Sequence, residues 1–498
     1  MLTQVLHMYV STPLVAMVFL GVAWGIIGGV LPGISASITM ALLVPFTYTM
    51  SAPMAIALLA TTYVGAEYGG SVPAILINTP GTNSAAATTI DGYAMKCLGR
   101  PGEALGISLY SATLGSIVGV IMLTVLTKPL ATIALMFTPM SYFALGVLGL
   151  SVIASVSGDA PVKALATGVI GMMVATVGSD PVSGVGRFTF GSPDLLSGIE
   201  PILVMVGLFA VSEMFVQASK ADWGLVEGKV RLRFPGRQLR RRLFRPQMIG
   251  AAIGTFEGIM PGAGGAVASF IAYNEARRWS HHKEEFGHGS PEGIAAPETS
   301  NAADAYGALI PLLSFGIPGS NSSAVLLGAF LIQGLTPGPQ LFKEAGNVIN
   351  GLYGGMFLAP IVLVILGLLI LPACIWLVNR PKIYLMAFIF ALILSGVYSI
   401  HNSIFDLGIV LVAGVAGYVM RVLDMPFLPA VLGLVLGSMV ESNFRRSLVL
   451  SDGDYGIFLH DHISAAFLAV SVLFIGGSFC VQLWARVRTG MRVRSSPG

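Results

Sequence analysis

The sequence has 498 residues, of which 55% are hydrophobic and only 10% are charged, and its mean hydropathy is +0.81. Soluble domains carry about 25% charged residues, so the composition excludes a water-soluble globule of this size. The net charge of +3 is small and the basic residues are clustered, which disfavours nucleic-acid binding. The three cysteines lie far apart and form neither a disulfide framework nor a metal-binding motif.

Long uncharged segments occur along the whole chain. The first charged residue is Glu67, and five later uncharged segments reach the length of about 20 residues that a transmembrane helix needs. The pattern predicts an all-α, polytopic transmembrane protein with roughly 9 to 13 crossings at one helix per 20-odd residues. The later uncharged segments are 104–127, 129–158, 345–379, 383–405 and 463–485.

The basic residues predict which loops face the cytoplasm. Segment 220–245 holds nine of the chain's 27 lysines and arginines, and the tail after Trp484 is also rich in arginine. Positively charged loops stay on the cytoplasmic side, so we expect the linker and the C-terminus inside. The uncharged N-terminus fits an outside position, and the number of crossings is then odd.

The two halves of the chain contain similar motifs in the same order. Residues 25–33 resemble 254–262, and the polar run 78–84 resembles 316–322. Such self-similarity predicts two internal repeats. The predicted organisation is a first transmembrane repeat at 1–219, a basic cytoplasmic linker at 220–245, a second transmembrane repeat at 246–462, and a final helix with a basic tail at 463–498.

Each repeat contains a hydrophobic segment that a Pro-Gly sequence interrupts. Segment 246–273 lies between two polar, basic stretches and breaks at 260–265, which predicts a re-entrant hairpin that opens to the cytoplasm. Its counterpart, about residues 14–50, has uncharged flanks and is expected to open outside, so the repeats are predicted to be inverted. The alternative is a single kinked helix.

A helix that is broken inside the membrane exposes main-chain groups that can bind ligands. Free N–H groups at the start of a half-helix form an anion site, and free carbonyl groups suit Na⁺. Paired breaks in the two halves of a membrane protein indicate a transporter binding site. The alternative is that the polar residues only cap their own helices. The predicted substrate-binding residues are Asn78, Thr79, Pro80, Gly81, Thr82, Asn83 and Ser84, with Pro318, Gly319, Ser320, Asn321, Ser322 and Ser323.

Three acidic residues fall within or beside apolar segments. Glu67, Glu257 and Asp304 are candidates for coupling to Na⁺ or H⁺, because ionisable groups within a membrane are energetically unfavourable and usually have a function. The alternative is that they lie at segment ends in water. Glu298 and Asn301 belong either to the loop mouth or to the site. No P-loop, nucleophile-elbow or zinc-protease motif is present, so we expect neither an enzyme nor a cofactor or resident metal.

Short motifs follow one another in a distinctive order. In the first half they are Leu31-Pro32-Gly33, Tyr68-Gly69-Gly70-Ser71, Asn78–Thr82, Asp91–Met95 and Gly99. In the second half they are Met260-Pro261-Gly262, Pro297–Asn301, Gly316–Ser320 and Gly334–Pro339.

This set of motifs, spread from about residue 18 to 440, resembles the large membrane subunit of the tripartite tricarboxylate transporters, the TctA family. The resemblance implies a subunit that imports a carboxylate across the bacterial inner membrane, driven by an ion gradient. It also implies two partners, a small four-helix membrane subunit and a periplasmic solute-binding protein. The two polar loops are then expected to hold the substrate. The hairpin residues expected to frame the cavity or the coupling-ion site are Pro32, Gly33, Ser35, Pro261, Gly262, Gly264 and Gly265.

The leading hypothesis is therefore ion-coupled import of a di- or tricarboxylate by alternating access, with one repeat moving against the other in the lipid bilayer. A passive anion channel, which needs a continuous polar lining, is the first alternative. A carboxylate permease that works without partners is the second. An intramembrane enzyme is disfavoured because no catalytic constellation is recognisable.

Overall fold

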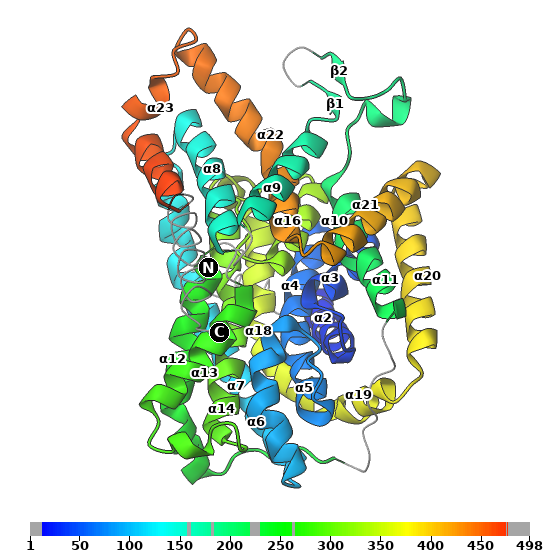
Figure 1. Ribbon diagram of the computed structural model, residues 1–498, viewed down its shortest axis with the longest axis vertical. Coiled ribbons are helices and arrows are strands. Elements are labelled where there is room, and N and C mark those ends of the chain that lie inside the picture. Colours follow the sequence, from blue (N-terminus) through cyan, green and yellow to red (C-terminus); the bar gives the residue numbers. More distant parts are fainter. Residues whose placement is uncertain are drawn as a thin grey trace, which may run out of the picture. The chain divides into compact units, whose positions relative to one another are not determined.

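The computed structural model describes residues 12–156, 161–180, 184–219, 230–260, 264–474 and 476. These residues form helices almost throughout, with one antiparallel pair of two-residue strands, β1 (Gly178–Ser179) and β2 (Gly186–Arg187). The predicted all-α, polytopic helical fold is confirmed (Figure 1).

The chain separates into two compact units, and each takes segments from both halves of the sequence. Unit 1 comprises Met1–Leu135 and Ile202–Tyr418, and unit 2 comprises Met136–Pro201 and Val419–Gly498. Unit 2 contains α8 (Pro139–Val156), α9 (Pro161–Ala175), α22 (Phe427–Leu450) and α23 (Ile457–His460). Its helix α22 packs on α8 and α9.

Unit 1 contains the helices that carry the predicted site. Those of its first segment are α2 (Thr12–Val30), α3 (Ala36–Thr47), α4 (Ala52–Gly69), α5 (Ser71–Ile77), the short helix η1 (Asn83–Ala85), α6 (Ala86–Cys97) and α7 (Pro101–Ala134). Those of its second segment are α10 (Pro201–Val206), η3 (Gly207–Val211), α11 (Ser212–Ser219), α12 (Arg237–Ile259), α13 (Gly264–Trp279), α14 (Pro291–Gly307), α15 (Leu309–Phe315), α16 (Asn321–Ile332), α17 (Leu341–Glu344), α18 (Gly346–Leu369), α19 (Leu371–Val378), α20 (Lys382–His401) and α21 (Ile404–Val422).

Glycine-lined contacts pair α2 with α4 and α12 with α14. A Cβ atom added to Gly25 would lie 2.3 Å from the carbonyl oxygen of Thr62, and one added to Gly254 would lie 2.0 Å from that of Ser300. Small residues at such positions let helix backbones approach closely in membrane proteins. The two helices that are held in this way, α4 and α14, are almost entirely buried.

Both of these buried helices end in the same sequence of local structures. After α4 the chain continues through Gly70 into the short helix α5, and after α14 it continues through Ala308 into α15. The short helices end in left-handed residues, Asn78 (φ 57°) and Gly316 (φ 75°), before the two Pro-Gly loops begin. These local correspondences fit the predicted duplication, but the duplication and its inverted orientation stay predictions.

The two predicted hairpins are both interrupted helix pairs. The first breaks between α2 and α3, where Gly33 has φ 84° and Ser35 caps α3 by accepting a hydrogen bond from the Ile38 N–H. The second breaks between α12 and α13, and its Pro261 and Gly262 lie outside the described residues. The re-entrant path of either pair through a membrane stays a prediction.

Seven helices in the described part of the chain are long and apolar enough to cross a membrane. Five shorter apolar helices add to them, and together they make a multi-pass membrane protein. The predicted segments 104–127 and 129–158 are divided differently from the expectation: Pro101–Ala134 is one helix that runs through Lys128, and Pro139 begins the next. The basic tail after Trp484 and residues 220–229 of the linker lie outside the described residues.

Candidate functional site

A group of buried polar side chains, which we call the central polar cluster, lies where α4 and α14 meet the two Pro-Gly loops. All of its members belong to unit 1 and are at most 8% exposed. They are Tyr63 and Glu67 from α4, Thr82 and Ser84 from the first loop and η1, Asn301 and Asp304 from α14, and Ser320 and Ser322 from the second loop and α16.

The first loop meets the carboxyl group of Glu67. The side chains of Ser84, Thr82 and Asn301 are its polar neighbours, and the Asn301 amide also donates a hydrogen bond to the Glu67 carbonyl oxygen at 3.3 Å. A main-chain hydrogen bond holds this loop to the end of α4, because the Gly81 N–H donates to the Gly70 carbonyl oxygen at 2.9 Å. The loop hydroxyl groups are thereby held against an acidic side chain from a different helix.

The second loop meets Tyr63, which lies one helical turn before Glu67. The Tyr63 and Ser320 hydroxyl oxygens are 3.0 Å apart, and Ser322 is a further polar neighbour of the tyrosine. Ser320 also forms a reciprocal capping box with Ser323 at the start of α16. Both serines therefore cap α16, but Ser320 also contacts Tyr63 of α4, so it does more than cap its own helix.

Asp304 faces the same region from α14. Its nearest charged neighbours are Glu67 and Glu257, both of which are acidic. A Cβ atom added to Gly265 would lie 2.6 Å from Ser84 Oγ, 2.9 Å from Asp304 Oδ2 and 3.2 Å from Asn301 Oδ1. The start of α13 therefore touches residues from both halves of the chain at one point.

Four buried oxygen atoms of the cluster form no hydrogen bond of standard geometry, although Thr82 and Asn301 lie beside the Glu67 carboxyl group. They belong to Glu67 (Oε2), Thr82 (Oγ1), Asn301 (Oδ1) and Asp304 (Oδ1). In the described part of the chain, neither Glu67 nor Asp304 forms an ion pair. Buried polar atoms are normally satisfied, and unpartnered ones indicate a ligand, an ion or a functional role. Carboxylate, amide and hydroxyl oxygens are the donors that hard cations prefer.

Other predicted substrate residues lie outside this cluster. Asn83 and Asn321 are exposed, and Asn78 occupies the left-handed end of α5. Thr79, Pro80 and Pro318 form the loop backbones, and Gly319 packs against the chain: a Cβ atom there would lie 2.4 Å from the Gly258 carbonyl oxygen.

The hairpin residues are divided between two places. Gly264 and Gly265 begin α13, and Gly265 touches the cluster as described above. Pro32, Gly33 and Ser35 lie at the break between α2 and α3, where a Cβ atom on Gly33 would clash with Gln217 of α11. The half-buried Glu257 lies near Asp304 without a hydrogen bond that links them.

Tyr63 is the cluster member that the sequence analysis missed. The sequence spacing does place Tyr63 beside Glu67, because residues four apart on a helix lie on the same face and Tyr63 precedes Glu67 by four. A tyrosine in an apolar segment is most often a packing residue, so the pattern alone did not indicate the contact with Ser320.

A second buried carboxyl group, that of Glu298, lies one and a half turns before Asp304 on α14. It accepts hydrogen bonds from three hydroxyl groups: Ser71 at 2.6 Å, Thr88 at 2.5 Å and Ser108 at 2.7 Å. These donors come from α5, α6 and α7, so the carboxyl group joins four helices. Unlike the acids of the cluster, it has no unpartnered oxygen.

Asp91, from the Asp-Gly-Tyr motif, joins α6 to the start of α14. Its Oδ1 accepts hydrogen bonds from the N–H groups of Gly287, Gly289 and Ser290 at 2.8–2.9 Å, and its Oδ2 accepts from the Tyr273 hydroxyl group at 2.9 Å. Asp91 therefore holds the loop before α14, and α14 in turn carries Asn301 and Asp304 into the cluster.

Comparisons with known proteins identify the family of this chain. The family model described as "Tripartite tricarboxylate transporter TctA family" matches residues 15–432. An uncharacterized 52.8 kDa protein in the TAR-I ttuC' 3' region of Agrobacterium vitis is 38% identical over 455 residues, which are 91% of each chain. A protein in the TAR-II ttuC' 3' region of the same organism is 35% identical over 222 residues, 45% of this chain and 92% of its own. No solved structure matches significantly. The chain belongs to the TctA family of tripartite tricarboxylate transporters.

Proposed function

We propose that this transporter subunit imports an organic di- or tricarboxylate and that a cation, Na⁺ or H⁺, binds at the central polar cluster to drive import. The observation that carries the proposal is the set of four unpartnered buried oxygens beside the two Pro-Gly loops. Two of them belong to acidic side chains that no basic residue of the described chain neutralises.

The acidic side chains explain why a cation and a carboxylate would bind together. A buried charge without a partner is strongly unfavourable, so Glu67 and Asp304 require protons or a metal cation. A carboxylate substrate that approached two ionised carboxyl groups would be repelled. A bound cation removes this repulsion, and the affinity for each ligand then depends on the other.

The second loop supplies donors that suit a carboxylate. The first N–H groups of a helix have no partner within the helix, and those of Asn321 and Ser322 begin α16. The hydroxyl groups of Ser320 and Ser322 lie beside them in the cluster. A carboxylate bound here would use the positive end of α16, and the cation would use the oxygens of Glu67, Thr82, Asn301 and Asp304.

The remaining parts of the proposal follow from the family and the charge distribution. Family members are components of tripartite transporters, and we propose a small four-helix membrane subunit and a periplasmic binding protein as the partners. We place the protein in the bacterial inner membrane, with a periplasmic N-terminus and a cytoplasmic C-terminus. Carboxylate import is not a chemical transformation, and we propose no enzymatic activity.

The direct test is uptake of radiolabelled citrate, succinate and tartrate into proteoliposomes that contain the assembled transporter, with an imposed Na⁺ or pH gradient. The expected result is accumulation above the external concentration with one of the two gradients, and only when the binding protein is present. Equilibration without accumulation would instead support a passive anion channel. Accumulation without the binding protein would support a permease that works without partners.

A further inference from the structure

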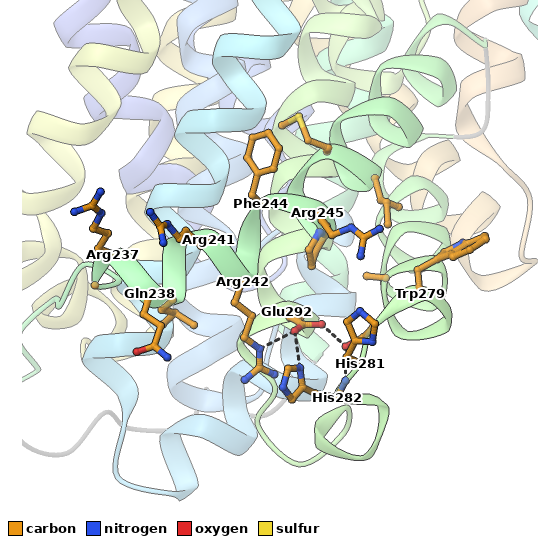
Figure 2. A pocket seen from close by; sticks show the side chains of 17 residues that line it. Arg237, Gln238, Arg241, Arg242, Phe244, Arg245, Trp279, His281, His282 and Glu292 are labelled. Atoms are coloured by element: carbon orange, nitrogen blue, oxygen red, sulfur yellow. Dashed lines mark hydrogen bonds and ion pairs between the residues drawn. The ribbon is translucent and has the colours of Figure 1, made fainter.

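A wide groove lies between the basic start of α12 and the end of α13, away from the central polar cluster. Its volume is about 1110 Å³. We call it the arginine groove, and Figure 2 shows its side chains along α12, with Trp279 contributed by α13. The residues used below are Arg237, Arg241, Arg245, Phe244, Ile249 and Trp279.

Three arginines of the groove present unneutralised positive charge. Arg237, Arg241 and Arg245 recur every fourth residue on α12, so they follow one face of the helix. All three are exposed, and none of them forms an ion pair within the part of the chain that the structure describes. Arginine at this spacing offers several guanidinium groups to one bound anion.

The acidic residue of the groove is already neutralised. Glu292 lies 2.6 Å from the Arg242 Nε atom and also accepts a hydrogen bond from the Ser280 hydroxyl group. Arg242 contacts Glu285 as well, at 2.6 Å. Arg242 therefore faces two carboxylates, those of Glu285 and Glu292, and the three remaining arginines of the groove still leave a net positive charge for a ligand.

The same face of α12 becomes apolar beyond the arginines. Ile249 and Phe256 lie four and eleven residues after Arg245, and eleven residues correspond to three turns. Phe256 is therefore about 16 Å further along the helix, and it is 62% exposed. Phe244 and Trp279 are 56% and 66% exposed at the groove itself. Aromatic side chains with this exposure are typical of the membrane–water interface.

We propose that the arginine groove binds one anionic phospholipid. The phosphate would lie among Arg237, Arg241 and Arg245, and an acyl chain would follow Ile249 and Phe256. A free phosphate or a small carboxylate could use the arginines but not the apolar face. Basic pockets on the cytoplasmic side of membrane proteins bind such headgroups, and the basic linker predicts that side for the start of α12.

Native mass spectrometry of the assembled transporter, purified from nanodiscs with equal phosphatidylglycerol and phosphatidylcholine, tests the proposal. The expected result is that the transporter retains one phosphatidylglycerol in preference to phosphatidylcholine. The triple variant Arg237→Gln/Arg241→Gln/Arg245→Gln should retain at least tenfold less phosphatidylglycerol. The control triple variant Arg231→Gln/Arg240→Gln/Arg277→Gln removes the same charge outside the groove and should leave retention unchanged.

The variant Phe256→Ser distinguishes binding of a phospholipid from binding of a free anion. A lipid that uses the apolar face should be retained less by this variant, and 10 mM inorganic phosphate should not displace it from the unaltered transporter. Equal retention of the two lipids, equal loss in both triple variants, or displacement by inorganic phosphate would overturn the proposal.

Discussion

The hydroxyl oxygens of Tyr63 and Ser320 lie 3.0 Å apart although 257 residues separate them in sequence. Tyr63 precedes Glu67 by one turn of α4, and Glu67 is the acid that contacts Thr82 and Ser84 of the first loop. One helix thus connects both Pro-Gly loops. A structural change at either loop can affect the other loop through the side chains of Tyr63 and Glu67.

The Tyr63–Ser320 contact should matter for uptake more than for folding. Tyr63→Phe keeps the buried ring and removes only the hydroxyl group, and a neutral hydrogen bond contributes about 0.5–1.5 kcal/mol. We expect the KM for the carboxylate to rise about threefold to tenfold, with unchanged abundance in the membrane. Ser320→Ala should have a similar effect. The double variant should be no worse than the more affected single variant, and strictly additive losses would contradict a shared contact.

The first loop offers a comparison between two neighbouring residues. Ser84 is buried in the central polar cluster, whereas Asn83 is exposed. We expect Ser84→Ala to lower uptake at least fivefold and Asn83→Ala to change it less than twofold. Uptake by reconstituted transporter, normalised to protein content, measures both. The reverse order would show that the loop acts through its exposed side chain.

Asp304 should be required for coupling. Asp304→Asn removes the charge and retains an oxygen, so the fold should persist. We expect uptake to fall at least tenfold because the cation loses a charged ligand. The control is Glu103→Gln, which removes an acid that pairs with Arg100 on the surface and should leave uptake unchanged. Full uptake by Asp304→Asn with its ion dependence intact would exclude this residue from the cation site.

Gly81 and Gly319 should be needed for packing at the base of the loops. A Cβ atom on Gly81 would lie 1.9 Å from the Gly29 carbonyl oxygen, and one on Gly319 would lie 2.4 Å from that of Gly258. We expect either alanine substitution to destabilise the protein by about 1–3 kcal/mol, as overpacking does, and to lower the Tm in detergent. Gly408→Ala is the control, since nothing lies within 4 Å of a Cβ atom there. An unchanged Tm in Gly81→Ala would show that the two backbones can separate freely.

Glu298 should stabilise the fold without a part in transport. Its carboxyl group accepts hydrogen bonds from Ser71, Thr88 and Ser108, and a hydrogen bond to a charged group contributes about 1.5–3 kcal/mol. Ser108→Ala should therefore lower the Tm and leave the ion dependence of uptake unchanged. Ser116→Ala is a matched control on the same helix, because its buried hydroxyl group lies beside Tyr306 and forms no hydrogen bond with Glu298. Equal Tm values for the two variants would contradict the structural role of Glu298.

The sequence predicted the helical fold because uncharged segments of membrane length are a strong physical signal. It also predicted that both Pro-Gly loops bind substrate and that Glu67 and Asp304 are candidates for ion coupling. Broken helices and acidic side chains are energetically unfavourable in a membrane unless they have a partner or a ligand. Which side chains meet could not be predicted, because that depends on packing between distant helices. Tyr63 and Asn301 enter the cluster for this reason, and Asn83 and Asn321 stay exposed.

The division of the chain into two compact units could not be predicted from the sequence either. Motifs are matched along the chain, but unit 1 takes in α2 to α7 together with the helices from α10 onward to Tyr418, and residues 136–201 lie in unit 2. Contacts between helices that are remote in sequence decide this grouping. Hydropathy reports only that each helix is apolar.

We propose that the carboxylate and the cation bind to this protein in mutual dependence. Isothermal titration of the purified transporter with carboxylate, at 1 mM and 100 mM NaCl with choline chloride as balance and at pH 5.5 and 8, measures this dependence. We expect at least tenfold tighter binding of the carboxylate with more Na⁺ or at lower pH, and loss of that dependence in the double variant Glu67→Gln/Asp304→Asn. Equal affinity of the unaltered transporter in all four conditions would contradict it.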